Sequence, residues 1–190
     1  QLIHIKKFPL LLGAIHHENK KDIEKFPLTI AYCQKCCHVQ QIKLVEEVIM
    51  NRVYDAEYYN CPSPVSTGMG LREIEKFYSF FNENNLKKGK LLEVACFDGF
   101  LLRKIQNDGW DVYGCDPSPM TVIAENLIGE VKIKNEYFYK GLYMRDSFDC
   151  IVFRNLLEHI YDLHEFITSV SYSLKDGGHI FIDVPNLITY

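Results

Sequence analysis

Residues Leu91–Leu102 read LLEVACFDGFLL, and this stretch decides the fold. The apolar run from Leu91 to Cys96 predicts a buried strand, and the helical pattern that follows begins at Gly99. A buried strand that turns tightly into a helix is the βα unit of open α/β sheets, in which ligands bind beyond the carboxyl ends of the strands. The free N–H groups of the first helical turn favour such binding, as do small residues that let a ligand approach the backbone.

The rest of the chain after about residue 68 continues to alternate between helical and strand patterns. We expect helices at 71–84, 99–107, 117–127 and 162–174, and strands at 90–96, 111–115, 131–133, 148–153 and 179–184. This order predicts an α/β fold over residues 69–190, with a Rossmann-like sheet of five parallel strands. Residues 1–68 are interpreted as a small irregular N-terminal segment that ends in a stretch rich in proline and serine.

The composition is that of a soluble globular protein. The 190 residues are 47% hydrophobic and 24% charged, which excludes a disordered chain, a collagen-like repeat and a coiled coil. The formal net charge is −4 and basic residues gather nowhere, so we expect no nucleic-acid partner. The best apolar run, residues 8–15, is too short to cross a bilayer, so we expect no membrane partner.

The cysteines indicate the redox compartment. There are seven, an odd number spread over a full-sized domain. Cys96, Cys115 and Cys150 each lie in an apolar, strand-like context, where a free cysteine behaves as a small hydrophobic residue. This distribution favours a reducing compartment over a disulfide framework, and the sequence shows no secretory signal. We therefore predict a cytoplasmic protein.

The turn after the first strand separates two classes of nucleotide cofactor. A dinucleotide-binding G-x-G-x-x-G pattern would need glycine at the positions of Ala95, Phe97 and Phe100, and it fails at all three. The stretch instead resembles motif I of the class I S-adenosylmethionine-dependent methyltransferases, acidic-x-Gly-x-Gly-x-Gly. Glu93 and Gly99 match that motif, whereas Ala95 is a small substitute and Phe97 is a departure.

The resemblance implies S-adenosylmethionine as the cofactor, bound by the motif I residues, which are Glu93, Ala95, Cys96, Phe97 and Gly99. At the end of the next predicted strand, Asp116 stands where the family places the carboxylate that accepts both ribose hydroxyls. A carboxylate suits that position because it only accepts hydrogen bonds and the two hydroxyls donate them.

Other residues near this site have two open interpretations. Asp116 and Pro117 either contact the cofactor or form only a helix cap. Arg154, at the end of the fourth predicted strand, either lines the cofactor site or caps the helix that follows. In the family, adenine contacts come from the loop after the third strand, which corresponds to residues 135–138 here.

Residues 149–160, DCIVFRNLLEHI, resemble the fourth strand of these methyltransferases and the Leu-Glu-His element after it. Methyl transfer to carbon needs a base that removes a proton. We expect His159 to be this base, with Glu158 beside it, because both residues follow the strand on the ligand side. The alternative is a structural histidine, since Leu-Glu-His is common at this place in many methyltransferases.

The N-terminal segment narrows the resemblance. Residues 26–40, FPLTIAYCQKCCHVQ, resemble the second zinc knuckle of the sugar C-methyltransferase-like family, whose members carry a small zinc-binding domain before the methyltransferase domain. The resemblance implies zinc ligands at Cys33 and Cys36, with Cys37 where glycine is usual. Structural zinc takes four ligands, and the partner Cys-x-x-Cys is expected upstream of the first residue. The alternative is a pair of thiols without metal, because the other candidates are poor substitutes by spacing: His4, His16, His17 and Cys61.

The same resemblance extends to both ends of the predicted methyltransferase domain. Residues 53–59 resemble the family's linker, in which a tyrosine reaches the active site, so Tyr59 or Tyr58 is a further catalytic candidate. Members of the class continue to a sixth strand and an antiparallel seventh, and the sugar C-methyltransferases carry a Tyr/Glu/His cluster downstream. We therefore expect a fragment or a truncated relative with incomplete catalytic equipment.

Three functions are compatible with these residues, and in the first two the partner is a small-molecule acceptor. The first is methyl transfer to the carbon of a sugar or nucleotide-sugar. The second is methyl transfer to the oxygen or nitrogen of another metabolite. The third is a cofactor-binding module without activity, which the phenylalanine in motif I favours.

Overall fold

The computed structural model describes residues 2–10, 12–13, 23–51, 59–60 and 62–186, with only the backbone described at 12–13 and 59–60. The chain divides into two compact units, residues 1–61 and 62–190. The predicted division after residue 68 lies inside the second unit. The short helix α2 (Pro64–Thr67) belongs to that unit because Ser63 and Val65, at its start, both donate hydrogen bonds to Asp98.

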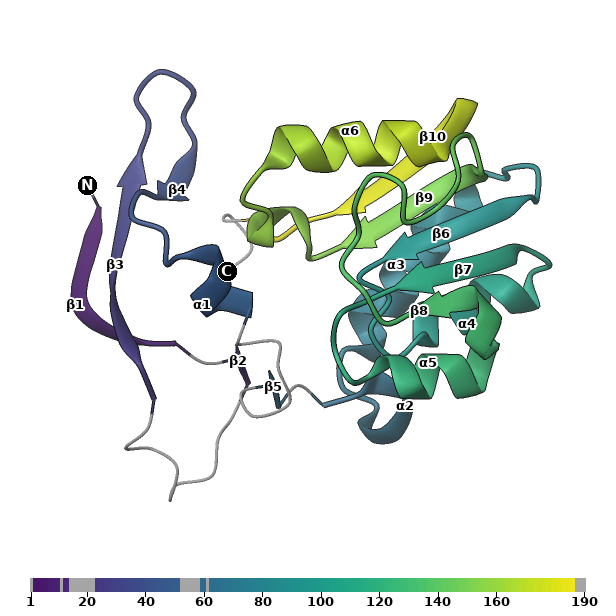
Figure 1. Cartoon of the computed structure of the whole chain (residues 1–190), viewed down its shortest axis with the longest axis horizontal. Coiled ribbons are helices and arrows are strands. Elements are labelled where there is room, and N and C mark those ends of the chain that lie inside the picture. Colours follow the sequence, from purple (N-terminus) through teal and green to yellow (C-terminus); the bar gives the residue numbers. More distant parts are fainter. Residues whose placement is uncertain (1, 11, 14–22, 52–58, 61, 187–190) are drawn as a thin grey trace. The chain divides into compact units, whose positions relative to one another are not determined.

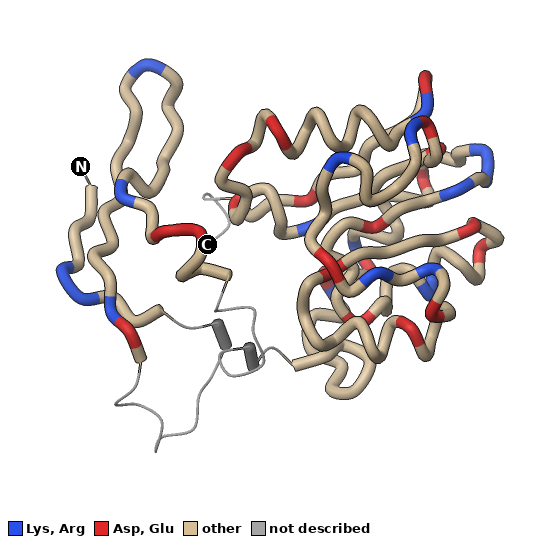
Figure 2. The backbone as a smooth tube through the Cα atoms, viewed as in Figure 1, with Lys and Arg blue, Asp and Glu red and all other residues tan. Residues whose placement is uncertain are grey.

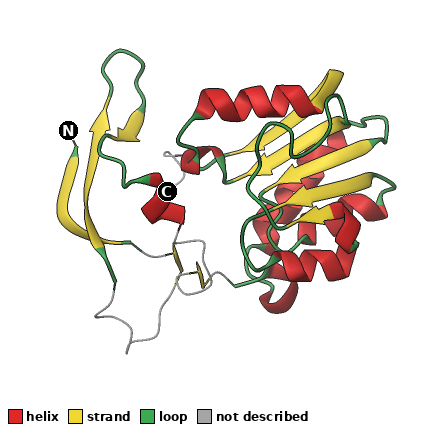
Figure 3. Cartoon of the chain, viewed as in Figure 1, coloured by secondary structure: helices red, strands yellow, loops and turns green. Residues whose placement is uncertain are grey.

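The second unit is built on a five-stranded sheet, shown in Figures 1 and 3. The strands lie in the order β10-β9-β6-β7-β8, and their bounds are β6 (Lys90–Val94), β7 (Asp111–Cys115), β8 (Ile133–Lys134), β9 (Phe148–Arg154) and β10 (Leu174–Asp183). Every pairing is parallel, which confirms the predicted Rossmann-like sheet. The chain first extends the sheet on one side of β6 and then on the other, so a topological switch point lies between β6 and β9. Ligands of open α/β sheets bind at such a point.

Helices cover both faces of this sheet (Figure 1). On one face lie α3 (Leu71–Glu83), α4 (Phe100–Asn107) and α5 (Thr121–Ile128), and on the other lies α6 (Leu163–Ser173). Successive strand residues alternate between the two faces: Leu91 packs into the core that contains Phe77 of α3, and Leu92 into the core that contains Phe166 of α6. The result is a three-layer α/β/α domain.

The helix α3 follows directly from its sequence pattern. Ile74, Phe77 and Phe81 are buried, and their spacing of three and four residues places them on one face of the helix. The last helix is also set by its cap, because the Asp162 carboxylate accepts the backbone N–H of Glu165 at 2.8 Å. These helices therefore lie where the periodicity and the capping residues predict them.

The helix α5 begins later than expected, at Thr121 instead of Pro117. The Asp116 carboxylate accepts the backbone N–H of Ser118 at 2.8 Å, and the Ser118 carbonyl accepts the hydroxyl of Thr121. These bonds hold the residues after β7 in a turn before the helix can start.

The two edge strands of the sheet, β8 and β10, also differ from their predicted bounds. Residues Glu130–Lys132 form a 3-10 turn, and only Ile133–Lys134 pair with β7 as β8. The Lys132 N–H donates to the Gly129 carbonyl at 3.1 Å, which holds these residues in the turn and leaves Val131 94% exposed. At the opposite edge, β10 begins at Leu174 instead of His179, with a register shift between these two residues.

The first unit contains two small sheets of short strands. One is antiparallel with the order β1-β3-β4, and the other is the parallel pair of β2 and β5. Its elements are β1 (Ile3–Pro9), β2 (Leu12–Gly13), β3 (Lys25–Tyr32), β4 (Val39–Gln41), α1 (Glu47–Asn51) and β5 (Tyr59–Asn60). The His4 ring in β1 lies 2.9 Å from the Thr29 hydroxyl in β3, so this histidine joins the two strands.

Charged residues of both signs are interspersed along the second unit (Figure 2). Lys132 pairs with Asp111 at 2.6 Å and Lys175 pairs with Asp149 at 2.7 Å, so these cations are locally compensated. In the described parts of the chain, no helix combines the length and the apolar character that crossing a membrane requires.

A close contact between α4 and α5 makes Gly99 sensitive to substitution. A Cβ added at Gly99 would lie 2.9 Å from the Cβ of Ala124, whereas one added at Gly109, beyond the other end of α4, would meet no atom within 4 Å. Both glycines have positive φ, so replacement by alanine costs each about 1–2 kcal/mol of backbone strain. We expect Gly99→Ala to lower the free energy of unfolding by about 1–3 kcal/mol more than Gly109→Ala, because of overpacking. Urea unfolding of the two variants measures this difference, and equal losses would contradict the packing argument.

Candidate functional site

The loop that joins β6 to α4 has an unusual backbone. Ala95, Phe97 and Gly99 have φ values of 61°, 52° and 74°, so alternate residues adopt the left-handed conformation. These are the three positions at which motif I carries glycine, and left-handed backbone is the physical reason for glycine there. The loop keeps this conformation although two of the three residues bear side chains.

Hydrogen bonds to β7 hold the loop in place. The N–H of Ala95 donates to the Cys115 carbonyl at 2.8 Å, and the N–H of Phe97 donates to Asp116 Oδ2 at 3.0 Å. A non-glycine residue in the left-handed region costs roughly 1–2 kcal/mol, and these bonds offset that cost. Cys96 contributes only backbone to the loop surface, because its side chain is buried in the core beneath.

Asp116 connects the end of β7 to the loop that follows β6 through a hydrogen bond. Its Oδ2 accepts the N–H of Phe97 from the loop after β6, and its Oδ1 accepts the N–H of Ser118. The Asn135 side chain, after β8, donates to the main-chain carbonyls of Asp116 and Ser118 at 3.0 and 2.9 Å. Burial raises the pKa of Asp116 above its ordinary value, and the hydrogen bonds from Ser118 and Phe97 oppose that rise. Pro117 lies in the turn beside this carboxylate.

Glu93 is a buried carboxyl group on β6 at the same edge. It is 5% exposed, and among the described residues its Oε2 has no hydrogen-bond partner. Burial raises its pKa to about 8; Arg154 opposes the rise, and Asp98 and Asp116 add to it. Such a group favours a donor or a cation that enters from outside the protein.

Asp98 is part of the site, although the sequence patterns did not single it out. It is 2% exposed and accepts three hydrogen bonds, from the Ser63 hydroxyl at 2.6 Å and from the N–H groups of Val65 and Phe100 at 3.0 Å. These bonds attach the start of α2 to the loop between β6 and α4. The only sequence signal was an acidic residue before a helix, since Ser63 lies 35 residues away in an irregular stretch.

Arg154 ends β9 on the same face of the sheet as Glu93. Its Nε and Nη2 both lie 3.1 Å from Asp183 Oδ2 at the end of β10, and its guanidinium lies 4.9 Å from the centre of the Phe77 ring. The side chain is therefore held between α3 and β10. Its positive charge acts on Glu93. The 3-10 turn that follows β9 has no side-chain cap, so Arg154 does not cap it.

The two predicted catalytic residues of the Leu-Glu-His element lie together after β9. Residues Leu157–His159 form a 3-10 turn, in which His159 Nε2 lies 4.0 Å from Glu158 Oε1. Both side chains are partly exposed, so solvent and ligands can reach them. Tyr59 lies in β5 with its side chain outside the described atoms, and Tyr58 lies outside the described residues, as do His16, His17 and Cys61.

The predicted zinc ligands lie in a tight turn between β3 and β4. The N–H groups of Cys36 and Lys35 donate to the Cys33 sulfur and lower the pKa of this thiol. Cys37 has a φ of 58°, which explains why glycine is usual at that position. The described residues contain no group of three or more histidine, cysteine or acidic side chains that could hold a metal ion. Structural zinc takes four ligands, so Cys33 and Cys36 do not form a complete zinc site within the described residues.

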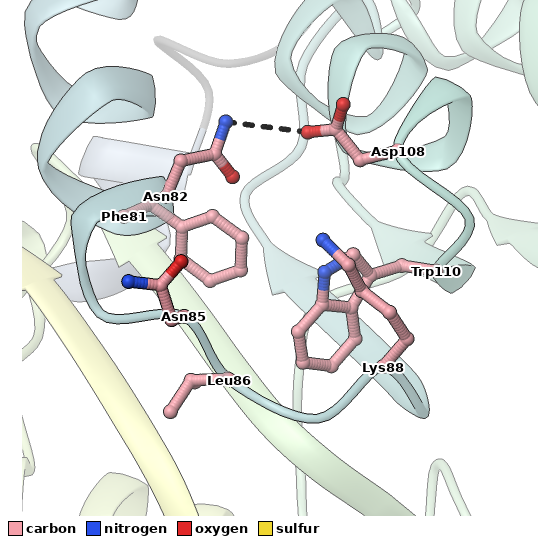
Figure 4. Close-up of a pocket in the computed structure, with 7 residues that line it drawn as sticks. All are labelled: Phe81, Asn82, Asn85, Leu86, Lys88, Asp108 and Trp110. Atoms are coloured by element: carbon pink, nitrogen blue, oxygen red, sulfur yellow. Dashed lines mark hydrogen bonds between the residues drawn. The ribbon is translucent and has the colours of Figure 1, made fainter.

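A separate pocket lies at the other end of the strands, next to the amino ends of β6 and β7 (Figure 4). It has a volume of about 290 Å³, and Figure 4 shows the Phe81 and Trp110 rings along it with the Asn82 amide directed at Asp108. Asp108 already accepts the Tyr78 hydroxyl at 2.6 Å. Functional sites of open α/β sheets lie at the carboxyl ends of strands, so this pocket is not the candidate site.

The residues at the carboxyl edge fit a cationic nucleoside cofactor. The left-handed loop is held against the end of β7, Asp116 is an acceptor that suits hydroxyl groups, and Glu93 is a buried acid without a partner for Oε2 among the described residues. Together with the parallel sheet, these features define a Rossmann-like, nucleoside-binding domain.

Comparison with known proteins gives the family. A family model described as a methyltransferase domain matches residues 69–188, and the chain belongs to this family. Ubiquinone biosynthesis O-methyltransferases of Aliivibrio fischeri (strain MJ11) and Pelagibacter ubique (strain HTCC1062) are each 30% identical over 116 and 117 residues, covering 57% and 60% of this chain. Each match covers 49% of the relative, so the chain spans about half the length of these curated proteins.

Solved structures show the same fold. The PH0226 protein from Pyrococcus horikoshii OT3 superposes with a TM-score of 0.57 at 22% identity, covering 63% of this chain and 61% of that one. The YcgJ protein from Bacillus subtilis has a TM-score of 0.51 at 17% identity, covering 57% of this chain and 50% of that one. Together with the family match over residues 69–188, this likeness confirms the class I S-adenosylmethionine-dependent methyltransferase fold that motif I implied.

The hydrogen bond from Ser63 to Asp98 predicts a measurable stability effect. In Ser63→Ala, the buried Asp98 carboxylate loses its shortest hydrogen bond, which costs about 1–3 kcal/mol of unfolding free energy. Ser147→Ala is the matched control, because that hydroxyl donates to the Met144 carbonyl in an exposed place, and we expect a change within about 0.5 kcal/mol. Ser63→Thr keeps the hydroxyl and should retain most of the wild-type stability. Chemical denaturation of the three variants tests this, and a loss in Ser63→Ala no larger than that in Ser147→Ala would refute it.

Proposed function

We propose that the second unit binds S-adenosylmethionine at the carboxyl edge of the sheet and that the protein transfers its methyl group to a small molecule. The observation that carries this proposal is the left-handed loop at residues 95, 97 and 99 bonded to the buried Asp116 carboxylate. It supports a ribose site because a carboxylate, which accepts hydrogen bonds from hydroxyl groups, lies where the carboxyl ends of two adjacent parallel strands meet. When bound, the cofactor supplies an already activated methyl group on a sulfonium centre.

The residues of this chain then have three tasks. The loop and Asp116 orient the cofactor, Glu93 and Arg154 set the charge beneath it, and Asp98 keeps the start of α2 on the loop. Orientation matters because methyl transfer needs the acceptor in line with the methyl group, with water excluded.

The pair His159 and Glu158 is our candidate for removing the acceptor's proton. Both follow β9, one of the two strands at the topological switch point, and both are accessible. A positioned general base contributes about 10²–10⁴-fold to the rate. Tyr59 stays a further candidate from the linker.

For the acceptor atom, we favour a hydroxyl oxygen. The named relatives are O-methyltransferases, and they match the domain that carries His159. A sugar or nucleotide-sugar carbon is the second candidate, and the turn at Cys33–Cys37 favours it, because the hydrogen bonds to the Cys33 sulfur suit a metal ligand. Zinc in this protein remains a prediction that depends on two further ligands. A cytoplasmic location is likewise a prediction, supported by the six described cysteines, none of which forms a disulfide.

Binding of the cofactor is the first test. We expect Asp116→Ala to weaken S-adenosylmethionine binding about 10–100-fold, since loss of charge-assisted hydrogen bonds costs about 1.5–3 kcal/mol. Asp108→Asn, at the opposite edge of the sheet, should bind like wild type. Titration calorimetry gives the affinities, and thermal unfolding shows that each variant is folded. Wild-type affinity in a folded Asp116→Ala protein would place the cofactor elsewhere.

The acceptor is tested by transfer of an isotopically labelled methyl group. We expect labelled product from a panel of phenolic and other hydroxyl acceptors, and about 10²–10⁴-fold slower turnover in His159→Ala. His164→Ala is the control, because this histidine lies on the exposed side of α6. Label only in nucleotide-sugars, at carbon, would favour the second candidate. Binding without transfer to either panel would make the chain a cofactor-binding module.

A further inference from the structure

We propose that Glu93 carries a proton in the cofactor-free protein and releases it to solvent when S-adenosylmethionine binds. This inference rests on the proposed function. It concerns the charge state of the Glu93 carboxyl group, which is buried near the carboxyl end of β6. The reaction is a simple ionisation, in which the carboxyl O–H bond breaks and the proton passes to the buffer.

The first argument is the position of the carboxyl group. Glu93 precedes the last residue of β6 and points to the side of the sheet that α3 and α4 cover, where it is 5% exposed. Water does not reach its Oε2, and the described residues offer that atom no hydrogen bond. An ionised carboxylate in such a place is costly unless it is paired, so the neutral acid is favoured.

The second argument is the set of charges around it. Asp98, on the loop after β6, and Asp116, at the end of β7, are two further buried carboxyls that act on Glu93. Asp98 accepts three hydrogen bonds and Asp116 accepts two, so their negative charges are stabilised where they are. Glu93 Oε2 lacks that support among the described residues, so hydrogen bonds do little to stabilise a negative charge on this carboxyl group.

The remaining neighbours do not reverse this balance. Arg154, from β9, is the cation that opposes the effect, but its guanidinium already pairs with Asp183 at 3.1 Å. The thiols of Cys96 and Cys115 have raised pKa values because they are buried, and at neutral pH they add no charge. The Glu93 pKa of about 8 agrees with this geometry.

A cationic ligand changes the balance. S-adenosylmethionine brings a sulfonium and an ammonium group to an edge that holds three carboxyls, and a positive charge nearby favours the ionised form of Glu93. By linkage, a ligand that lowers the pKa of an acid binds more tightly as pH rises toward that acid's pKa in the free protein. The association constant should therefore rise by up to about tenfold per pH unit between pH 6 and 8 and level off above pH 8.

The test is titration calorimetry of the full chain with S-adenosylmethionine at pH 7 in phosphate and in Tris, whose ionisation enthalpies differ. We expect wild type to release close to one proton more than Glu93→Gln, because a group with a pKa of about 8 is mostly protonated at pH 7. Comparison of the two proteins cancels any titration of the ligand itself. Asp146→Asn, at an exposed turn, is the matched control and should release as many protons as wild type.

The outcomes separate the inference from the function on which it rests. Equal proton release by wild type and Glu93→Gln, with binding intact, overturns the inference and leaves the proposed function standing. Absence of binding by wild type overturns the proposed function itself. Infrared difference spectra of wild type provide a test that needs no variant: the carbonyl band of a protonated carboxyl should disappear on addition of S-adenosylmethionine, and its persistence refutes the proposal.

Discussion

The contact between the Asp116 carboxylate and the Phe97 N–H is the interaction on which the rest of the site depends. It joins the loop after β6 to the end of β7, and through Ser118 it also fixes the turn that delays α5. A charged acceptor is needed there because a neutral one would compensate less of the strain of a left-handed phenylalanine. Asp116, the carboxylate that we propose for the ribose, therefore also stabilises the loop between β6 and α4.

The charged groups around this contact differ in whether they are paired. Asp98 is fully engaged with α2 and α4, Arg154 with Asp183, and Glu93 is left between them without a partner for one oxygen among the described residues. Natural proteins tolerate such a buried acid mainly where function requires it, because burial without compensation is costly. A positively charged ligand at the carboxyl ends of the strands would compensate these acids, whereas Asp108, in the pocket at the amino ends, already accepts hydrogen bonds from Tyr78 and Asn82.

The sequence predicted the parts of this architecture that depend on local patterns. The strands β6, β7 and β9 are largely apolar runs, α3 and α6 show helical periodicity, and α6 also has a capping aspartate, so their positions followed from residues close together in the chain. Motif I and Asp116 were found by resemblance to the methyltransferase family, because both belong to one strand–helix–strand unit, β6–α4–β7. The start of α5 and the length of β8 were wrong, since both depend on hydrogen bonds and exposure that periodicity does not record.

The contacts between distant residues could not be predicted in the same way. Ser63 and Asp98 are separated by an entire helix and strand, and Arg154 meets Asp183 only because β9 and β10 are adjacent in register. The left-handed loop has one more consequence. Because Ala95 and Phe97 carry side chains, the unfolded chain has fewer conformations to lose here than a glycine-rich loop would have. In the folded protein, the hydrogen bonds to Cys115 and Asp116 already fix the loop, so less conformational entropy is lost when a ligand binds to it.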